Sequence, residues 1–362
     1  MTDKLKAARE IIDSVDKEMA RLFEQRMRAA ELVYEYKREH GLEIYDAKRE
    51  EEVIEKNAQY IENTALRAYY VNFLENTMKI SRSYQSMLME GMRVAYSGAT
   101  GAFAHIAAGK LFPSARKIGF GNFENAYNAV RDGVCDVAVL PIENSYNGEV
   151  GQVTDLIFSG PLYVNGMTEL AITQDLLGVP GATLSDIKEV VSHPQALGQC
   201  HEYIVEHGFK EKEYNNTALA ARYVKEKNDK AFAAIASKEA AEIFGLSVLE
   251  KNINASANNT TRFLILSRVQ NKNIQISAKT TSLLFFTVRN EAGALAKAIE
   301  IIGKHGFNMR SLRSRPMKEL LWQYYFYVEA EGDLNTEEGA KMLEELKSCC
   351  DRLTSKGTFI KN

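Results

Sequence analysis

The stretch Asp136-Val-Ala-Val-Leu-Pro-Ile-Glu-Asn-Ser145 decides how the middle of this chain folds. Its short apolar, β-branched run predicts a buried strand. The run is followed by a polar turn that carries Glu143, Asn144 and Ser145. In an open α/β sheet, ligands bind beyond the carboxyl ends of the strands, where loop side chains converge over a rigid floor. The stretch therefore predicts a binding site as well as a fold.

The region around this strand has the pattern of an α/β domain. From Met92 onward, glycines and prolines punctuate short β-branched runs that alternate with helical stretches. The pattern predicts a doubly wound α/β domain over residues 92 to about 269, large enough for two lobes. Its expected strands are residues 93–96, 137–140, 170–172, 190–192, 231–235 and 263–266.

The flanking regions predict two further units. Before Gly91 there is no proline, and apolar residues recur at helical spacing, which predicts a helix to about residue 39 and helices near 46–60 and 65–89. So long a first helix can bury its apolar stripe only in a bundle or a dimer. After a polar linker at 268–273, a strand at 282–288, a helix after Gly293 and a strand at 323–329 predict a small βαβ-type α+β domain.

Composition narrows the class of protein. The 362 residues suggest two or three domains, and 45% hydrophobic residues with 45 basic and 48 acidic ones favour a folded core and give no sign of nucleic-acid binding. The four cysteines lack metal-ligand spacing, and the adjacent pair Cys349-Cys350 favours reduced thiols, so we expect no metal and no cofactor. The polar N-terminus and the absence of any run near the roughly 20 apolar residues of a membrane span predict a cytoplasmic protein without a membrane partner.

The first predicted helix carries a pair of cations on one face. Arg26 and Lys37 are 11 residues apart, which at about 100° per residue leaves them within about 20° of one face and about 16 Å apart. Two such long cationic side chains could bind a small anion between them. Arg9 lies about 100° off that face, so it could reach such a site only from the partner in an antiparallel dimer.

The other two predicted helices add polar groups at helical spacing. Asp46 and Glu50 are one turn apart with Arg49 beside them, and Ser81 and Gln85 share an i, i+4 face. On spacing alone, an ordinary solvated helix face is the expected interpretation, because charged faces are the rule on exposed helices.

Residues 3 to about 88, with the run Asp46-Ala-Lys-Arg-Glu50, resemble the all-helical chorismate mutases. That family rearranges chorismate to prephenate without a nucleophile or a proton transfer, by holding a dianion in a compact conformer and stabilising charge on its ether oxygen. The resemblance implies that Arg26 and the partner chain's Arg9 hold carboxylates, that Lys37 and Gln85 donate to the ether oxygen, that Asp46 and Glu50 orient the hydroxyl, and that Ser81 and Arg49 assist.

Three more segments lie beside expected strand ends: residues 97–105, 192–195 and 258–263. Each alone could be a simple turn, a loop or a strand start. Together with residues 141–145, they resemble prephenate dehydratase over 92–268. The resemblance implies two α/β lobes with the site in a hinged cleft, as in periplasmic binding proteins.

The dehydratase family removes hydroxide and carbon dioxide from prephenate and leaves phenylpyruvate. The resemblance places Thr261 beside the departing hydroxyl, which must be protonated or strongly hydrogen-bonded, and Arg262 on a carboxylate; the group that assists Thr261 stays open. Ala99, Ala102 and Ala104 depart from the family's usual hydroxyl or proline residues, although backbone N–H groups of the next helix could bind a carboxylate. The surrounding shell is implied to be Glu143, Asn144, Ser145, Ser192, His193, Gln195, Thr217 and Phe263.

The last unit resembles the ACT domains, whose fold is ferredoxin-like. The matching segments are Gly293, Ala294, Leu295 and Ala296, then Arg313, Ser314, Arg315 and Pro316. In that family the two segments bind phenylalanine between paired domains and inhibit the enzyme. Arg313 stands where the family has glutamate, a charge reversal that could change the effector. A domain that only dimerises is the alternative.

The three resemblances, in this order, predict a bifunctional chorismate mutase and prephenate dehydratase with a phenylalanine-binding ACT domain. The expected domains are residues 1–90, 92–269 and 277–362. Because the resemblance implies that each mutase site includes Arg9 of the partner chain, we expect a homodimer or homotetramer. Two alternatives stay open: a mutase fused to a ligand sensor, and an arogenate dehydratase, whose substrate bears an amine in place of the keto group.

Overall fold

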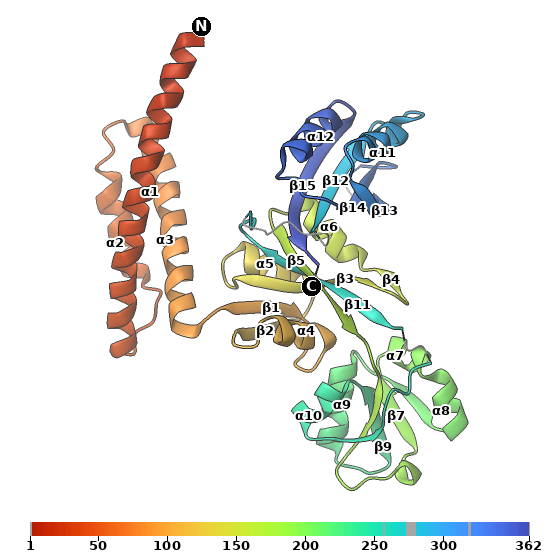
Figure 1. The fold of residues 1–362 in the computed structure, drawn as a ribbon. Helices are drawn as coiled ribbons and strands as arrows, with labels where there is room; N and C mark the ends of the chain where they lie inside the picture. Colours follow the sequence, from red (N-terminus) through yellow and green to blue (C-terminus); the bar gives the residue numbers. More distant parts are fainter. Residues whose placement is uncertain (1, 256–257, 273–279, 318–319, 362) are drawn as a thin grey trace. The chain divides into compact units, whose positions relative to one another are not determined.

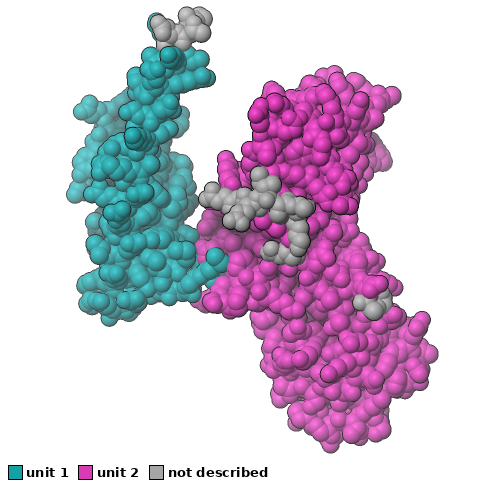
Figure 2. All heavy atoms as spheres, in the orientation of Figure 1, with its two compact units in different colours: residues 1–93 teal, residues 94–362 magenta. Residues whose placement is uncertain are grey.

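The structure is a computed structural model that describes residues 2–255, 258–272, 280–317 and 320–361. It forms two compact units, residues 1–93 and residues 94–362 (Figure 2). No helix among these described residues is both long and apolar enough to cross a membrane.

The first unit consists of helices. The three predicted helices are confirmed as α1 (Thr2–Glu39), α2 (Ala47–Ala58) and α3 (Arg67–Glu90), with a single 3-10 turn, η1 (Thr64–Leu66), before α3. Asp46 caps α2, because its side chain accepts a hydrogen bond from the Arg49 backbone N–H at 3.0 Å. The cap explains why α2 begins where it does.

The two halves of α1 have different surroundings. In the C-terminal half, Ala30 and Tyr34 are buried, and the Tyr34 hydroxyl donates to the Leu88 carbonyl of α3 at 3.1 Å. The N-terminal half exposes an apolar stripe in the single chain, with exposed fractions between 43% and 66%, made of Leu5, Ile11, Ile12, Val15, Met19, Leu22 and Phe23. The stripe that the sequence predicts is therefore exposed in the single chain, whereas the C-terminal half of the helix packs against α3.

The second unit begins with a lobe built on a six-stranded sheet of order β2-β1-β3-β11-β5, with β4 paired to β3 (Figure 1). β1 and β3 are parallel, whereas β11 runs antiparallel to both of its neighbours. The strands are β1 (Arg93–Ser97), β2 (Arg116–Phe120), β3 (Val137–Asn144), β4 (Gly148–Glu149), β5 (Tyr163–Ala171) and β11 (Thr260–Ser267), and the helices are α4 (Phe103–Leu111), α5 (Phe123–Arg131) and α6 (Gly151–Ser159).

A second lobe has its own five-stranded sheet, of order β10-β6-β9-β7-β8. The chain passes between the lobes twice, after β5 and before β11 (Figure 1). Its strands are β6 (Asp175–Gly178), β7 (Glu189–Ser192), β8 (Lys210–Glu213), β9 (Phe232–Ala236) and β10 (Ser247–Glu250), and its helices are η2 (Leu184–Asp186), α7 (Pro194–Gln199), α8 (His201–His207), α9 (Thr217–Lys227) and α10 (Lys238–Phe244). The predicted two-lobed α/β domain is confirmed.

Strand β3 is longer than the sequence analysis predicts. The expected polar turn starts at Glu143, but β3 continues to Asn144, because it pairs with both β4 and β11. The register shifts opposite Pro141, so a bulge accommodates a proline that has no N–H for the ladder. Since successive strand residues point to opposite faces, Glu143 and Asn144 face different ways.

The C-terminal part of the second unit is a four-stranded sheet of order β13-β14-β12-β15. Its elements are β12 (Thr280–Val288), α11 (Ala294–Lys304), β13 (Asn308–Pro316), β14 (Tyr324–Glu331), α12 (Glu337–Lys347) and β15 (Cys350–Ile360). The predicted helix and two strands are confirmed, whereas β13, α12 and β15 were not predicted. The expected domain start, residue 277, and the linker's last residue, 273, lie outside the described residues.

Candidate active sites

The first candidate site is a cavity of about 150 Å³ in the helical unit. All three helices contribute to it, and most of its polar lining was predicted from the sequence. The lining residues are Arg26, Val33, Lys37, Ile44, Asp46, Arg49, Glu50, Val53, Met78, Ser81, Arg82 and Gln85.

Two cations of α1 are held in place at this cavity. Arg26 donates to the Ser81 hydroxyl and, at 3.5 Å, to the Thr77 carbonyl. Burial lowers the pKa of Arg26, and the negative charge of Glu50 partly opposes that shift. The Lys37 ammonium donates to the Ile44 carbonyl at 2.6 Å. Both side chains therefore have fixed positions at the cavity.

Gln85 is a buried polar group of the predicted set, at 7% exposed. Its amide nitrogen donates to the Ser81 carbonyl at 3.3 Å, which leaves its second N–H for another acceptor. Its carbonyl oxygen is buried without a hydrogen-bond partner in the described structure. The amide is thus incompletely satisfied at the cavity wall.

Arg9 and Arg82 are the two differences from the predicted set. Arg9 is exposed on the N-terminal half of α1 and is not among the lining residues. Arg82 lines the cavity but was not predicted, although its position one turn after Met78 and between Ser81 and Gln85 is a signal for the same helix face.

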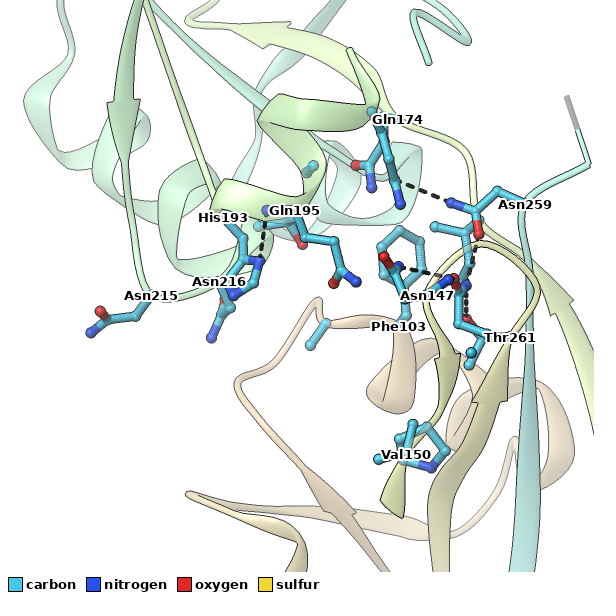
Figure 3. A pocket seen from close by; sticks show the side chains of 18 of the residues that line it. Phe103, Asn147, Val150, Gln174, His193, Gln195, Asn215, Asn216, Asn259 and Thr261 are labelled. Atoms are coloured by element: carbon cyan, nitrogen blue, oxygen red, sulfur yellow. Dashed lines mark hydrogen bonds between the residues drawn. The ribbon is translucent and has the colours of Figure 1, made fainter. Parts of the chain in front are cut away.

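The second candidate site is a cavity of about 480 Å³ that residues of both α/β lobes enclose (Figure 3). The lining residues are Ala102, Phe103, Phe123, Pro141, Asn144, Asn147, Gly148, Glu149, Val150, Ile172, Gln174, His193, Gln195, Ala196, Gln199, Asn215, Asn216, Thr217, Asn259 and Thr261. Four of the predicted shell residues are among them, and so is Thr261. The amides Asn147, Gln174, Gln199, Asn215 and Asn259 were not assigned, although Gln199 follows Gln195 at i+4 on α7.

A chain of directed hydrogen bonds ends at Thr261, which is 9% exposed. The Asn144 carbonyl oxygen accepts the backbone N–H groups of Tyr146 and Asn147, at 3.0 and 2.9 Å. Because a backbone N–H can only donate, this fixes the orientation of the Asn144 amide. Its NH2 group then donates to the Thr261 hydroxyl oxygen at 2.9 Å and to Asn259 at 2.7 Å. The Thr261 proton is left free to point elsewhere.

His193 has an equally defined orientation. It caps α7, and its Nδ1 accepts the Gln195 backbone N–H at 3.2 Å (Figure 3). Nδ1 must therefore be unprotonated, so the neutral ring carries its hydrogen on Nε2. The ring can donate from Nε2 to a bound molecule.

No lysine or arginine is among the described residues that line this cavity. The starts of α4, α6 and α9 do contribute to it, through Ala102, Val150 and Thr217. The first two helices lack a side-chain cap, so their initial N–H groups have no local side-chain acceptor. Helix N-termini attract anions, so the cavity suits a carboxylate without a basic side chain.

The other predicted shell residues lie away from this cavity. Ser192 is fully buried and donates to the Ile235 carbonyl at 2.6 Å, and Phe263 is in the hydrophobic core at 2% exposed. Glu143, Ser145 and Arg262 instead line a separate cavity of about 350 Å³ beside β13. Strand alternation explains the separation, because Glu143 and Arg262 pair in the ladder directly beside Asn144 and Thr261.

Arg262 is surrounded by carboxylates beside this separate cavity. Its guanidinium lies 3.4 Å from Glu143, 3.1 Å from Glu169 and 3.5 Å from the buried Glu329 of β14. Arg313 of β13 also bonds to Glu143. These ion pairs link the lobe sheet to the C-terminal sheet.

The two predicted effector segments differ in their surroundings. Gly293, at φ +85°, caps α11. Of the residues that follow it, Ala296 is exposed, whereas Leu295 is half-buried against the hydrophobic core of this sheet. The second segment is on the edge strand β13, where Arg315 forms a two-pronged bond to Asp155 of α6, at 2.9 and 3.1 Å. Asp155 raises the pKa of Arg315, so that guanidinium stays charged.

Comparison with known proteins matches three families along the chain. They are chorismate mutase type II over residues 8–86, prephenate dehydratase over 94–271 and the ACT domain over 282–348. A bifunctional chorismate mutase/prephenate dehydratase of Aquifex aeolicus is 30% identical over 362 residues, covering 99% of this chain and 98% of that protein. The chain belongs to this family.

Solved structures resemble the dehydratase and ACT parts of this bifunctional family member. The prephenate dehydratase of Arthrobacter aurescens in complex with L-Phe superposes with a TM-score of 0.68 at 27% identity, over 74% of this chain and 90% of that one. A chain described as GqqA, a novel type of quorum quenching acylase, gives 0.69 at 31% identity, over 75% and 98%. Because one fold hosts both descriptions, the function must rest on the sites.

Proposed function

We propose that the chain converts chorismate to prephenate in the helical cavity and prephenate to phenylpyruvate in the cavity between the lobes. The observation that carries this proposal is the presence of two separate polar cavities, one rich in cations and one built around a directed threonine hydroxyl. Phenylalanine, bound by the ACT domain, inhibits the second step.

The helical cavity performs a rearrangement that needs no proton transfer. Arg26 supplies positive charge for a carboxylate of the dianion, and Lys37 and the free N–H of Gln85 donate to the ether oxygen as charge develops there. Asp46 and Glu50 accept from the substrate hydroxyl, with Ser81 and Arg49 beside them. Fixed donors stabilise this transition state because they do not have to reorganise.

A second copy of the chain completes this cavity. The exposed apolar stripe on α1 supports a helical dimer. A long helix with such a stripe is stable in water when another helix buries the stripe, and no helix of the same chain does so among the described residues. In an antiparallel pairing Arg9 reaches the partner's cavity and binds the second carboxylate. A co-expressed mixture of Arg9→Ala and Lys37→Ala chains should then regain about a quarter of the wild-type sites, as random pairing of a symmetric dimer requires. If the mixture stays inactive, Arg9 does not act across the dimer.

The cleft cavity performs the dehydration. The Asn144 amide occupies a lone pair of the Thr261 oxygen, so the Thr261 hydroxyl donates its own proton toward the departing hydroxyl of the ring. The ring carboxylate leaves as carbon dioxide, its electron pair enters the ring, and the C–O bond breaks. The departing hydroxide takes up one proton, supplied from solvent along the Thr261 hydrogen bond, and leaves as water, so Thr261 ends the step neutral. The uncapped starts of α4 and α6 hold the side-chain carboxylate, with His193, Gln195 and Thr217 around it.

Arg262 acts on the opposite face of the same sheet. It stabilises the ladder that carries Thr261 and does so through Glu143 and Glu169. In this arrangement its contribution to carboxylate binding is indirect, through the placement of its neighbour.

The ACT domain supplies feedback regulation. Residues 293–296 follow β12 and residues 313–316 end β13. Both strands pair antiparallel with β14 and so run in the same direction, which puts the two segments at the same end of the sheet. Phenylalanine binds there between two ACT domains. Binding shifts the dehydratase only if the effector has different affinities for two arrangements of the lobes.

The experiment that tests the proposal supplies the purified protein with chorismate, prephenate and arogenate in separate reactions. We expect phenylpyruvate from the first two, with less in the presence of phenylalanine. Prephenate that accumulates from chorismate without phenylpyruvate would contradict the dehydratase assignment and favour a sensor. Faster turnover of arogenate than of prephenate would make the second site an arogenate dehydratase.

A further inference from the structure

Arg82 is a basic residue of the helical cavity that the family resemblance does not include. It lies on the face of α3 that also presents Met78, Ser81 and Gln85, so helix geometry directs it into the cavity lining. Its side chain is 26% exposed, close to the 24% of Glu50, to which it is bonded. The Arg82 guanidinium also lies over the Tyr45 ring, 5.2 Å from its centroid.

The remaining cations of the cavity have other partners. Arg26 is bonded to Ser81, Lys37 to the Ile44 carbonyl, and Arg49 faces Glu52 at 3.5 Å on the outside. Among the described side chains that line the cavity, Arg82 is thus the cation that contacts the Glu50 carboxylate. The charges around Glu50 are Arg26 and Lys37 from α1, Asp46 and Arg49 from the start of α2, and Arg82 from α3.

A bare carboxylate at Glu50 would oppose the binding of a dianion in so small a cavity. A bonded guanidinium removes that repulsion and also fixes the carboxylate, which leaves its second oxygen to accept from the substrate hydroxyl. The stacking on Tyr45 limits the movement of Arg82 in turn.

We propose that Arg82 is a positioning residue of the mutase site, which acts through Glu50 by holding its carboxylate in the cavity and neutralising its charge against the incoming dianion. The inference rests on the proposed mutase function. It distinguishes Arg82 from Arg26, which contacts the substrate directly.

A double-mutant cycle on the full chain tests this proposal, with Arg82→Gln, Glu50→Gln and the double variant assayed for chorismate turnover. Arg82→Gln should raise the KM for chorismate about tenfold with a smaller change in kcat, since it leaves one uncompensated charge at the ligand. In the Glu50→Gln background the same substitution should change KM by less than about twofold, because the charge it compensates is gone. Arg82→Lys should restore most of the affinity.

Controls keep the outcomes distinct. Arg21→Gln removes an exposed ion pair with Glu18 on α1 and should leave KM unchanged. If the fold-changes in KM of the two single variants multiply in the double variant, Arg82 acts independently of Glu50. That result would overturn the proposal. A lowered melting temperature with an unchanged KM would overturn it as well. A wild-type protein that leaves chorismate untouched would instead contradict the proposed function itself.

Discussion

The two candidate cavities of this protein differ in the kind of positive charge that they offer. The helical cavity has Arg26, Lys37, Arg49 and Arg82 in its lining, whereas no lysine or arginine is among the described lining residues of the cleft between the lobes. The cleft instead has helix starts and a set of oriented amides. Long basic side chains suit a reaction that only needs charge held in place, and oriented dipoles suit one in which a proton must move in one direction.

The difference predicts different sensitivities to substitution. Each cation of the helical cavity contributes a discrete charge, so its removal should affect the mutase directly. Backbone N–H groups cannot be removed by changing a side chain, so the dehydratase should depend most on Thr261 and on the amide that orients it.

The largest effect should come from Thr261→Ala. Without a hydroxyl beside the departing group, dehydratase turnover should fall by about 10³-fold or more, within the range for loss of a proton donor, while mutase turnover stays unchanged. Separate assays with prephenate and with chorismate measure the two steps. Thr261→Ser keeps the hydroxyl and should retain activity. Loss of both activities in a folded Thr261→Ala protein would refute the separation of the sites.

Lys37→Ala should be next in size. Loss of this donor to the ether oxygen should lower mutase turnover about 10² to 10³-fold, as removal of one fixed donor does in other enzymes. Arg28→Ala, which removes a cation with a 79% exposed side chain from the same helix, is the matched control and should have no effect. Equal activity of the two variants would show that the cavity is not the mutase site.

Asn144→Asp tests the direction of the hydrogen bond in the cleft. A carboxylate can only accept, so Thr261 would donate to Asp and its proton would turn away from the substrate. We expect dehydratase kcat to fall about 100-fold, and further than in Asn144→Ala, which removes the donor to Thr261 without adding an acceptor. An Asn144→Asp protein as active as the wild type would contradict the role assigned to the amide.

Leu295→Asp should give the smallest change, and only in regulation. A charge in the first effector segment should shift the phenylalanine inhibition curve by about tenfold or more, while turnover without phenylalanine stays the same. Leu321→Asp changes an 89% exposed leucine of the same domain and is the control. Identical curves for wild type and Leu295→Asp would place the effector elsewhere.

The sequence predicts the helical cavity better than the cleft, for a physical reason. Helix spacing is regular, so Arg26 and Lys37 could be assigned to one face and do line one cavity. The cleft depends on where a strand ends. Because β3 runs on to Asn144, Glu143 and Arg262 face away from Thr261, and nothing local in the sequence marks that extension.

Two further features could not be predicted from local pattern. Ser192 belongs to one of the segments that resemble the dehydratase family. Its hydroxyl, however, donates to the Ile235 carbonyl, a contact between residues far apart in sequence. Strand β13 was missed because it is a polar strand with alternating exposure, at the edge of the sheet that the described residues form, where it pairs with β14. Tertiary pairing decides both cases.

The most direct test of the central claim mixes the Thr261→Ala and Lys37→Ala proteins and supplies chorismate. Each protein alone should fail to make phenylpyruvate, the first because it stops at prephenate and the second because it makes almost none. Together they should convert chorismate to phenylpyruvate, with prephenate passing through solution. If the mixture also fails while both proteins are folded, the two reactions do not take place in two separate cavities.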